Sequence, residues 1–545
     1  MAECEVRRVV SEGVCDGGGI DGGSDGVLRV LQWCSPASIV GESDADERAW
    51  GGGPTRNPVS PEKGLPLDFQ FRQTDDKDKV IKEERGVAWK AKLGDRTAIP
   101  PVVAGGLVWV GSNARQPADE AIKEKDWDGG LLLCFRESDG KPLWEHRTPR
   151  LSGKGVAWCE DFSRAALGSA PLVEGDRLYY VNNRTEVVCF DIAPLKNGTG
   201  KSTEVWKLDM RKELGVFPHL PNMQFGFGAS VAGHKDKLYV VTHNGVDESH
   251  TKVPAPDAPS LVCLEKATGK VVWKDNSPGK GILEYQMSSP LVAEVNGKPQ
   301  VIVGQGDGWL RAFEAATGKL VWKCDLNAKE AVYELGGTGN RNSVVATPVF
   351  HDNRVYVATG LHLEAFHGPA ALYCVDPTRV GDVSRELDDG PKKGKPNPNS
   401  AVVWYTPQAV PADAPRIEVG KTKKRDLLRS RDFYFGRSVA GCVAHDGLVY
   451  AADTQGFVYC FDAKTGKLYW VDDLKAGVRG QLLWADGKVL VGTDWGELFV
   501  FAHGKENKRL AMIEAENAFY AGPVLANGTL YLTTENTLHA IRQPK

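Results

Sequence analysis

The sequence predicts an all-β protein, an eight-bladed β-propeller made of four-stranded antiparallel blades. Three observations predict it. Short segments that alternate apolar and polar residues around Gly, Asp or Asn turns recur along the chain, which is typical of antiparallel hairpins. Tryptophan recurs at one position of this repeat, and 61 glycines supply tight turns. The repeat continues to the end of the chain, which indicates one ring rather than several domains.

Each repeat unit consists of two hairpins, whose strands we name A to D in chain order. The first hairpin reads, for example, APLVEGDRLYYVN from Ala170, and the second reads CLEKATGKVVW over Cys263–Trp273. A Thr-Gly or Asp-Gly pair forms the turn between strands C and D, because glycine accepts the positive φ that a tight turn needs. First hairpins near residues 100, 170, 230, 290, 348, 440, 481 and 523 give eight units, which are the predicted blades.

The two ends of the repeat region complement each other. The last unit ends at Ile541 after strand C, and GVAWKAKLG at residues 86–94 matches a strand D that no strand A, B or C precedes. We therefore expect this N-terminal strand to complete the last blade and close the ring, which leaves no exposed sheet edge. Seven blades then carry the strand D tryptophan, at Trp89, Trp144, Trp206, Trp273, Trp322, Trp404 and Trp470.

The second hairpin also carries a family resemblance. AFEAATGKLVW at Ala312–Trp322 and CFDAKTGKLYW at Cys460–Trp470 are similar to the tryptophan-docking motif of quinoprotein propellers. The chain resembles the PQQ-binding-like β-propeller repeat proteins over residues 86–541. That superfamily includes pyrroloquinoline-quinone-dependent alcohol dehydrogenases and BamB-type outer-membrane assembly lipoproteins. In the family the motif packs blades together and contacts no substrate, so the resemblance implies the fold and leaves the activity open.

Residues 1–49 do not match the repeat. We expect them to form a non-repeat N-terminal segment, either disordered or translated from a start codon assigned too early, and residues 50–545 to form a single propeller. The stretch VLRVLQWC is too short and interrupted for a signal-peptide core. The resemblance implies the periplasm or cell envelope, whereas the missing signal peptide leaves a cytoplasmic location open.

Composition excludes several classes of function. The chain has 67 Lys and Arg against 71 Asp and Glu, a net charge of −4, and these charges are interspersed. We therefore expect no nucleic-acid partner. No apolar run approaches the 18 residues of a membrane-spanning helix, so we expect a protein that does not span a membrane. We also expect the protein to be a monomer. Five of the 11 cysteines share one strand C position and are predicted to be small buried core residues: Cys134, Cys189, Cys263, Cys374 and Cys460.

One polar loop, HNGVDESH, gathers the side chains of His243, Asp247, Glu248 and His250. A zinc site needs three or four converging ligands. Histidines seven residues apart in a polar loop are more often solvated, so we predict no metal site from this sequence.

Long inserts indicate which face of the ring is elaborated. In a propeller the B–C loops and the D–A connections share one face, which we call the insert-rich face. Its inserts are residues 112–129, 147–167, 208–227, 243–259, 325–343 and 405–436. The opposite face carries two C–D inserts, 192–203 and 377–401. Binding usually resides in loops on a rigid scaffold, so we expect a partner on the insert-rich face.

Residues that enter strand A on this face surround the central channel. Aromatic, Arg, Asn and acidic side chains there suit a flat anionic ligand; the alternative is that they plug the channel and hydrogen-bond one another. The candidate cofactor-binding residues are Trp158, Glu160, Asp161, Tyr285, Gln286, Arg341, Asn342, Arg437, Arg479 and Gln481, accompanied by Phe225, Phe435 and Tyr520. No catalytic residue can be assigned to these positions.

Three hypotheses follow. The leading one is a non-catalytic binding or scaffolding module that needs no cofactor and engages a protein or cell-envelope partner. The absence of a CxxCH haem motif and of an adjacent-cysteine pair favours it. The alternative implied by the resemblance is a PQQ-dependent alcohol or sugar dehydrogenase, with Ca²⁺ at the channel mouth and Asp161 as the first base to test. The third is a glycan- or polymer-binding propeller.

Overall fold

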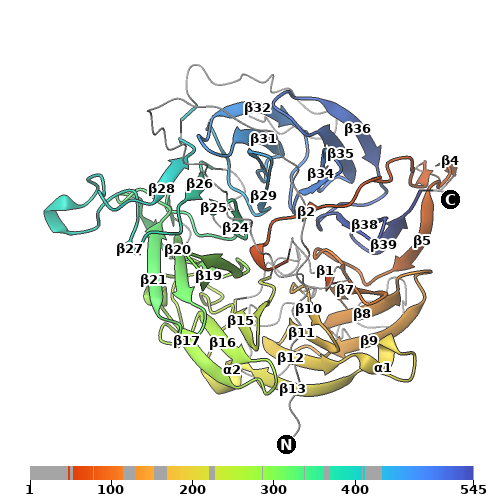
Figure 1. Cartoon of the computed structure of the whole chain (residues 1–545), viewed down its shortest axis with the longest axis horizontal. Helices are drawn as coiled ribbons and strands as arrows, with labels where there is room; N and C mark the ends of the chain where they lie inside the picture. Colours follow the sequence, from red (N-terminus) through yellow and green to blue (C-terminus); the bar gives the residue numbers. More distant parts are fainter. Residues whose placement is uncertain are drawn as a thin grey trace, which may run out of the picture. The chain divides into compact units, whose positions relative to one another are not determined.

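In a computed structural model of the chain, eight antiparallel sheets surround a central axis (Figure 1). The structure describes residues 47–48, 53–75, 77, 79–113, 129–151, 168–219, 228–284, 286–336, 338–360, 368–407, 409–410 and 433–543. Contacts divide the chain into residues 1–43 and 44–545, and the propeller lies in the second unit. The predicted eight-bladed propeller is therefore confirmed.

The first four blades follow one another in the chain, each with strands A to D from the axis outwards. Blade 1 contains β6 (Val102–Ala104), β7 (Leu107–Asn113), β8 (Gly130–Arg136) and β9 (Pro142–Thr148). Blade 2 contains β10 (Leu172–Glu174), β11 (Arg177–Val181), β12 (Glu186–Asp191) and β13 (Thr203–Asp209). Blade 3 contains β14 (Ala232–His234), β15 (Lys237–Val241), β16 (Leu261–Glu265) and β17 (Val271–Asp275). Blade 4 contains β18 (Leu291–Val295), β19 (Lys298–Gly304), β20 (Trp309–Glu314) and β21 (Leu320–Asp325).

The other four blades complete the ring. Blade 5 contains β24 (Val349–His351), β25 (Arg354–Ala358), β26 (Leu372–Val375) and β28 (Val402–Tyr405). Blade 6 contains β29 (Cys442–His445), β30 (Leu448–Ala452), β31 (Phe457–Asp462) and β32 (Leu468–Asp473). Blade 7 contains β33 (Leu483–Ala485), β34 (Lys488–Gly492), β35 (Glu497–Ala502) and β36 (Arg509–Glu514). Blade 8 contains β37 (Val524–Ala526), β38 (Thr529–Thr533), β39 (Thr537–Ile541) and, from the N-terminal part of the chain, β5 (Val87–Lys92).

The predicted closure is confirmed by the pairing of β5 with β39, in which Trp89 lies opposite Ala540. Short elements decorate the ring. The extra strands are β1 (Glu47–Arg48) on β6, β2 (Val59–Ser60) on β33, β27 (Gly381–Asp382) on β21, and the hairpins β3 (Gln73–Thr74)–β4 (Val80–Lys82) and β22 (Tyr333–Glu334)–β23 (Thr338–Gly339). In the described part of the chain, the helices are α1 (Ala193–Lys196), α2 (Met210–Leu214) and the 3₁₀ turns Gly53–Thr55, Gly279–Gly281 and Gly390–Lys392. Within the described ranges, no helix has the length and apolar character needed to cross a bilayer.

The strand D tryptophans of blades 2, 3, 5 and 8 pack onto the C–D turns of the following blades. A Cβ atom built on Gly318 of blade 4 would lie 2.5 Å from the ring of Trp273 in blade 3, so only glycine allows this approach. The Trp273 indole N–H donates to the Ala315 carbonyl of the same turn at 3.0 Å. Three more pairs repeat this contact: Trp89 on Gly140, Trp206 on Gly269 and Trp404 on Gly466. The repeated motif therefore fastens one blade to the next.

The cysteine prediction is also confirmed. In five blades the strand C cysteine pairs with the strand D tryptophan, as Cys263 does with Trp273. All five thiols are buried. Burial raises the pKa of Cys263, Cys374 and Cys460 to about 12, so these thiols stay protonated and unreactive.

A segment that precedes the repeat reaches into the centre of the ring, a contact that no sequence pattern predicted. Arg56 is buried, and its guanidinium donates to the carbonyls of Pro290, Ser230 and Val231 at 3.0, 3.2 and 2.8 Å. Burial lowers the pKa of Arg56 to about 10, which leaves it charged near neutral pH. Asn57 exchanges two hydrogen bonds with the backbone of Ala444 in blade 6. Residues 56–57 thus link the inner strands of several blades.

Candidate functional site

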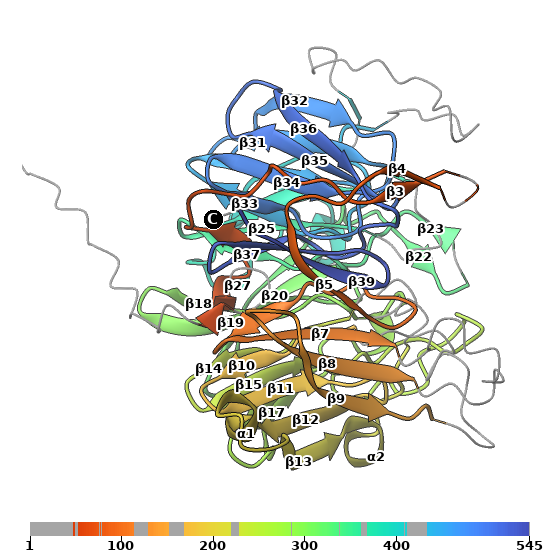
Figure 2. The ribbon, with the colours of Figure 1, turned by 90° about the vertical axis from the view of Figure 1, so that its right-hand side faces the viewer.

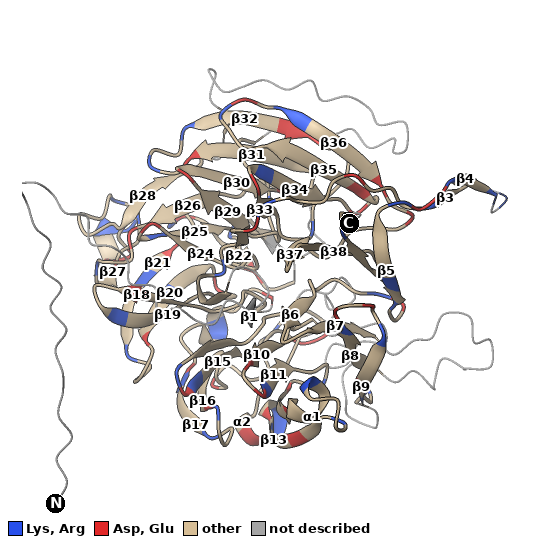
Figure 3. Ribbon diagram, turned by 45° about the vertical axis from the view of Figure 1, so that its right-hand side comes forward, with Lys and Arg blue, Asp and Glu red and all other residues tan. Residues whose placement is uncertain are grey.

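Where the structure describes them, inserts lie on both faces of the ring. Most of the predicted inserts 112–129, 147–167 and 405–436, and residues 220–227, lie outside the described residues. In Figure 2, which turns the view of Figure 1 by 90°, α2 and the β22–β23 hairpin lie on one face, whereas α1 and β27 lie on the other. The face with α2 and β22–β23 is the insert-rich face. Lys and Arg alternate with Asp and Glu around the ring in Figure 3, and neither sign dominates the described ribbon.

Four of the candidate channel residues, Trp158, Glu160, Asp161 and Tyr285, lie outside the described residues, as does Phe225. The remaining six can be placed. They are Gln286, Arg341, Asn342, Arg437, Arg479 and Gln481. Phe435 is buried in the core of blades 5 and 6, and Tyr520 lines the channel near Arg479 and Gln481.

Arg341 belongs to an ion-pair network at the junction of blades 4 and 5. Its guanidinium donates to the Asp325 carboxylate at 2.9 Å and to the Asp307 carbonyl at 2.9 Å. The buried Lys329 ammonium contacts the same carboxylate at 2.9 Å and lies 4.4 Å from the ring centre of Trp309. One buried carboxylate therefore pairs with two cations.

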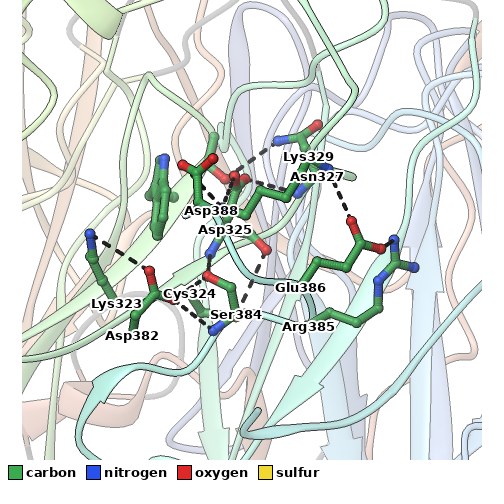
Figure 4. A network of polar contacts seen from close by, with 12 residues as sticks. Lys323, Cys324, Asp325, Asn327, Lys329, Asp382, Ser384, Arg385, Glu386 and Asp388 are labelled. Carbon is green, nitrogen blue, oxygen red and sulfur yellow. Dashed lines mark hydrogen bonds and ion pairs between the residues drawn. The ribbon is translucent and has the colours of Figure 1, made fainter. Parts of the chain in front are cut away.

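The C–D insert 377–401 of blade 5 supplies the other side of this network (Figure 4). The Asp325 backbone N–H donates to Ser384 Oγ at 2.9 Å, and the Lys329 backbone N–H donates to Glu386 Oε2 at 3.1 Å. β27 pairs with β21 of blade 4 in parallel. The network therefore attaches the insert to the neighbouring blade.

Two other channel candidates contact each other. The Arg437 Nε–H donates to Asn342 Oδ1 at 3.3 Å, and the Asn342 amide donates to the Pro369 carbonyl at 3.2 Å. Both side chains are buried, and burial lowers the pKa of Arg437. Arg479 pairs with Asp494 at 3.3 Å. Among the described residues, Gln481 Nε2 is buried with no hydrogen-bond partner.

Gln286 points into blade 3. Its amide donates to the Asn244 carbonyl at 3.0 Å and to Ser260 Oγ at 2.8 Å, so it supports the B–C insert 243–259. His243, at the base of the same insert, is fully buried, and burial lowers its pKa to about 4. Gln286 and His243 therefore fix the buried start of the insert against blade 3.

Three connections of the insert-rich face meet beside Gly245. The Gly245 N–H donates to the Phe217 carbonyl at 3.0 Å, and the Val246 N–H donates to the Glu284 carbonyl at 2.9 Å. A Cβ on Gly245 would lie 2.5 Å from His219 Cβ and 2.8 Å from the Glu284 carbonyl oxygen. Glycine at this position therefore allows the three connections to approach closely.

This arrangement brings two histidines and a glutamate together. The potential ligand atoms of His219, His250 and Glu284 lie within 4.8 Å of one another, so the three could hold a metal ion. His250 Nδ1 lies 2.6 Å from Glu284 Oε2, and the Tyr333 hydroxyl donates to Glu284 Oε1. Burial and this bond to a carboxylate raise the pKa of Tyr333, so the hydroxyl remains a donor. We call these four residues the histidine–glutamate cluster.

The prediction from the sequence was that there is no metal site, and only one member of this cluster was among the residues considered. Those residues were His243, Asp247, Glu248 and His250, and of these the structure places only His250 in the cluster. Asp247 accepts from the backbone N–H groups of Thr251 and Lys252, and Glu248 is exposed. The partners of His250 come from neighbouring D–A connections. Position on one face of successive blades was the signal that could have found them.

Comparisons with known proteins place the chain among PQQ-like propellers. The family model described as outer membrane protein assembly factor BamB matches residues 193–366 and 398–518, more than half of the chain. The chain is 26% identical over 216 residues to quinohemoprotein alcohol dehydrogenase ADH IIB of Pseudomonas putida. The aligned region covers 38% of this chain and 27% of that protein. It is 26% identical over 251 residues to polyvinylalcohol dehydrogenase of Sphingopyxis sp. (strain 113P3). This alignment covers 43% of this chain and 34% of that protein.

The chain thus spans between a quarter and about a third of the length of these two relatives. Among solved structures, BamB from Moraxella catarrhalis superposes with a TM-score of 0.49 at 13% identity, covering 83% of this chain and 96% of that chain.

Proposed function

The chain belongs to the protein family described as outer membrane protein assembly factor BamB, and from this premise we propose that it is a non-catalytic propeller that binds a protein partner in the cell envelope. The proposed binding surface is the insert-rich face. The family membership supports a binding role, and the described inserts of this face, which include α2 and the β22–β23 hairpin, supply a surface that the blade repeat does not need.

The observation that carries the proposal is the internal pairing of the channel candidates. A quinone cofactor needs free cationic groups for its carboxylates. Arg341 neutralises the buried Asp325, and Arg479 pairs with Asp494. These cations are already used to balance charges inside the fold.

The described candidates also do not fit a Ca²⁺ site beneath such a cofactor. Ca²⁺ takes six to eight oxygen ligands at about 2.3–2.6 Å. The Asn342 carbonyl oxygen accepts from the Arg437 guanidinium, and a cation in that position repels Ca²⁺. The dehydrogenase alternative therefore depends on Glu160 and Asp161, which the experiment below tests as part of the whole chain.

Two exposed valines on opposite faces allow a matched test. Val332, beside the β22–β23 hairpin on the insert-rich face, is 64% exposed, and Val380, in the C–D insert, is 65% exposed. We would replace each in turn by a photo-crosslinking phenylalanine analogue in the full chain and irradiate intact cells of the native host. We expect one envelope protein to be crosslinked at position 332 and not at 380, and the purified partner to bind the wild-type chain saturably.

Equal crosslinking from both positions, or no saturable binding by the purified partner, would contradict the proposal. A second arm addresses the enzyme alternative directly. Calorimetric titration of the full chain with PQQ in the presence of Ca²⁺ should show no binding; a dissociation constant in the micromolar range or below would support the dehydrogenase instead.

A further inference from the structure

We propose that His219, His250 and Glu284 form a Zn²⁺ site that ties three connections of the insert-rich face together. The inference goes beyond partner binding and does not depend on it. It rests on the way in which the fold holds the three side chains, on the chemistry of the donor set, and on the hydrogen bonds behind it.

The backbone around the cluster is fixed before any ion binds. The His219 N–H donates to the His243 carbonyl at 3.1 Å, and the Val246 N–H donates to the Glu284 carbonyl at 2.9 Å. Residues 217–219, 243–246 and 284 are therefore linked by main-chain hydrogen bonds across three connections. A preorganised set of ligands loses little conformational freedom when a metal binds, which raises affinity.

The tautomer of His219 is set by its surroundings. His219 Nδ1 lies 2.8 Å from the Val246 carbonyl oxygen, which can only accept, so the proton lies on Nδ1. The lone pair is then on Nε2. A metal-bound histidine commonly donates its other ring N–H to a backbone carbonyl in this way, because the bond fixes the ring and increases the basicity of the ligand atom.

Glu284 has a comparable second contact. The Tyr333 hydroxyl donates to Oε1, whereas Oε2 is the oxygen beside His250. One oxygen of the buried carboxylate is therefore held by a neighbouring side chain while the other faces the histidine. Ligating carboxylates in metal sites are hydrogen-bonded in the same manner.

Two imidazoles and one carboxylate match Zn²⁺ better than Ca²⁺ or Mg²⁺, which prefer oxygen ligands. With bonds of about 2.0–2.1 Å, ligand atoms around tetrahedral Zn²⁺ lie roughly 3.4 Å apart. The cluster, whose ligand atoms span up to 4.8 Å, approaches this spacing. The His250 side chain is 23% exposed on a turn and can make the adjustment, whereas Glu284 is 1% exposed and fixed. A water molecule would take the fourth position.

The test uses the full chain, dialysed against a chelator and then titrated with Co²⁺ and with Zn²⁺ as a competitor. We expect one Co²⁺ per chain, with the intense visible absorption of tetrahedral coordination, and its displacement by Zn²⁺. His250→Ala and Glu284→Gln should each weaken binding at least 100-fold. Tyr333→Phe removes only the hydroxyl behind Glu284 and should weaken it about 10- to 100-fold.

His234→Ala is the matched control, because His234 ends β14 of the same blade and is no part of the cluster. Its Co²⁺ affinity should equal that of the wild-type chain, and circular dichroism checks the fold of every variant. The proposal is overturned if the wild-type chain binds no stoichiometric metal, or if folded Glu284→Gln protein binds as tightly as wild type. Either result would mean that the cluster holds no metal ion, and it would leave the partner proposal intact.

Discussion

The C–D insert 377–401 of blade 5 and the B–C insert 243–259 of blade 3 are both polar, yet they make different contacts. The first pairs through β27 with the outer strand of blade 4, and Trp322 of that strand is fully buried. The second meets the D–A connections of its neighbours and contributes His250 to the histidine–glutamate cluster. One insert completes a blade junction, and the other helps to build a candidate site.

The reason for the difference lies in the blade that carries each insert. Blade 3 keeps its Thr-Gly turn, with Gly269 beneath Trp206, so its junction is complete without the B–C insert. Blade 5 has the C–D insert 377–401 where blade 3 has that turn. Trp322 instead donates from its indole to Gln300 Oε1 within its own blade. The insert is held by Asp325 and Lys329, whose backbone N–H groups donate to Ser384 and Glu386. Insert length alone therefore does not indicate binding.

The largest expected effect is at Asp325. Asp325→Asn removes the charge that balances Lys329 and Arg341 and leaves the buried Lys329 ammonium without its closest carboxylate. Breaking a buried ion pair costs about 3–5 kcal/mol. We expect this loss in the free energy of unfolding, measured by chemical denaturation at pH 7.

Asp382→Asn is the control on the insert itself. The Asp382 side chain is 37% exposed and lies 3.7 Å from Lys323, so its pair is worth less than about 1 kcal/mol. Equal losses for the two variants would show that the network around Asp325 is not what holds the insert.

A tryptophan-docked junction can be broken for comparison. In Gly318→Ala the new methyl group would lie 2.5 Å from the Trp273 ring, at a residue with a φ of +73°. Overpacking and the positive φ together should cost about 2–4 kcal/mol. In Gly175→Ala, where φ is +55° and no atom lies within 4 Å, only the backbone strain of about 1 kcal/mol remains. Thermal and chemical unfolding of both variants measure the difference. Similar losses in the free energy of unfolding would mean that the contact of Gly318 with Trp273 does not stabilise the blade junction.

Acid should act on the blade 3 insert through His243. Its pKa is about 4 in the folded chain because of burial, against an ordinary value of 6.5. Between these values the unfolded chain binds a proton that the folded chain does not, so the stabilisation is complete above pH 6.5 and decreases as the pH falls. The contribution of His243 should decrease by about 2 kcal/mol from pH 7 to pH 5.

His243→Gln carries no titrating ring and should reduce the pH dependence of unfolding by that amount. The insert 377–401 contains no histidine, so its amide exchange should change less over the same pH range than that of residues 243–252. An unchanged pH slope in His243→Gln would contradict the expected burial of the neutral ring.

The sequence predicted the blades and the closure because their signals are local. A turn glycine, a strand alternation and a tryptophan at a fixed spacing each lie within one hairpin, and Trp89 was recognisable in the same way. Arg56 was not predictable, because its partners Ser230 and Pro290 are 174 and 234 residues away in the chain.

The face that carries the candidate site was predictable from the sequence, but the residues of the site were not, because they are distant from one another in the chain. The insert-rich face followed from the counting of inserts, but the partners of His250 were sought within its own loop. A ring places the connections of successive blades next to one another, so His219 and Glu284 approach His250 through the topology and not through spacing. The predicted cofactor-binding roles at the channel mouth stay predictions.

The smallest global effect is expected at the loop that carries His250. The Asp247 carboxylate accepts from the N–H groups of Thr251 and Lys252 at 3.0 and 3.1 Å, on an exposed turn. Asp247→Ala should therefore free these amides to exchange at least 10-fold faster, while the free energy of unfolding changes by less than about 1 kcal/mol. Glu248→Ala, on the exposed side of the same turn, should change neither quantity. A global loss above about 2 kcal/mol in Asp247→Ala would mean that the blade 3 insert is as structural as the blade 5 insert, because local opening of one exposed turn leaves the strand pairing of the blades intact.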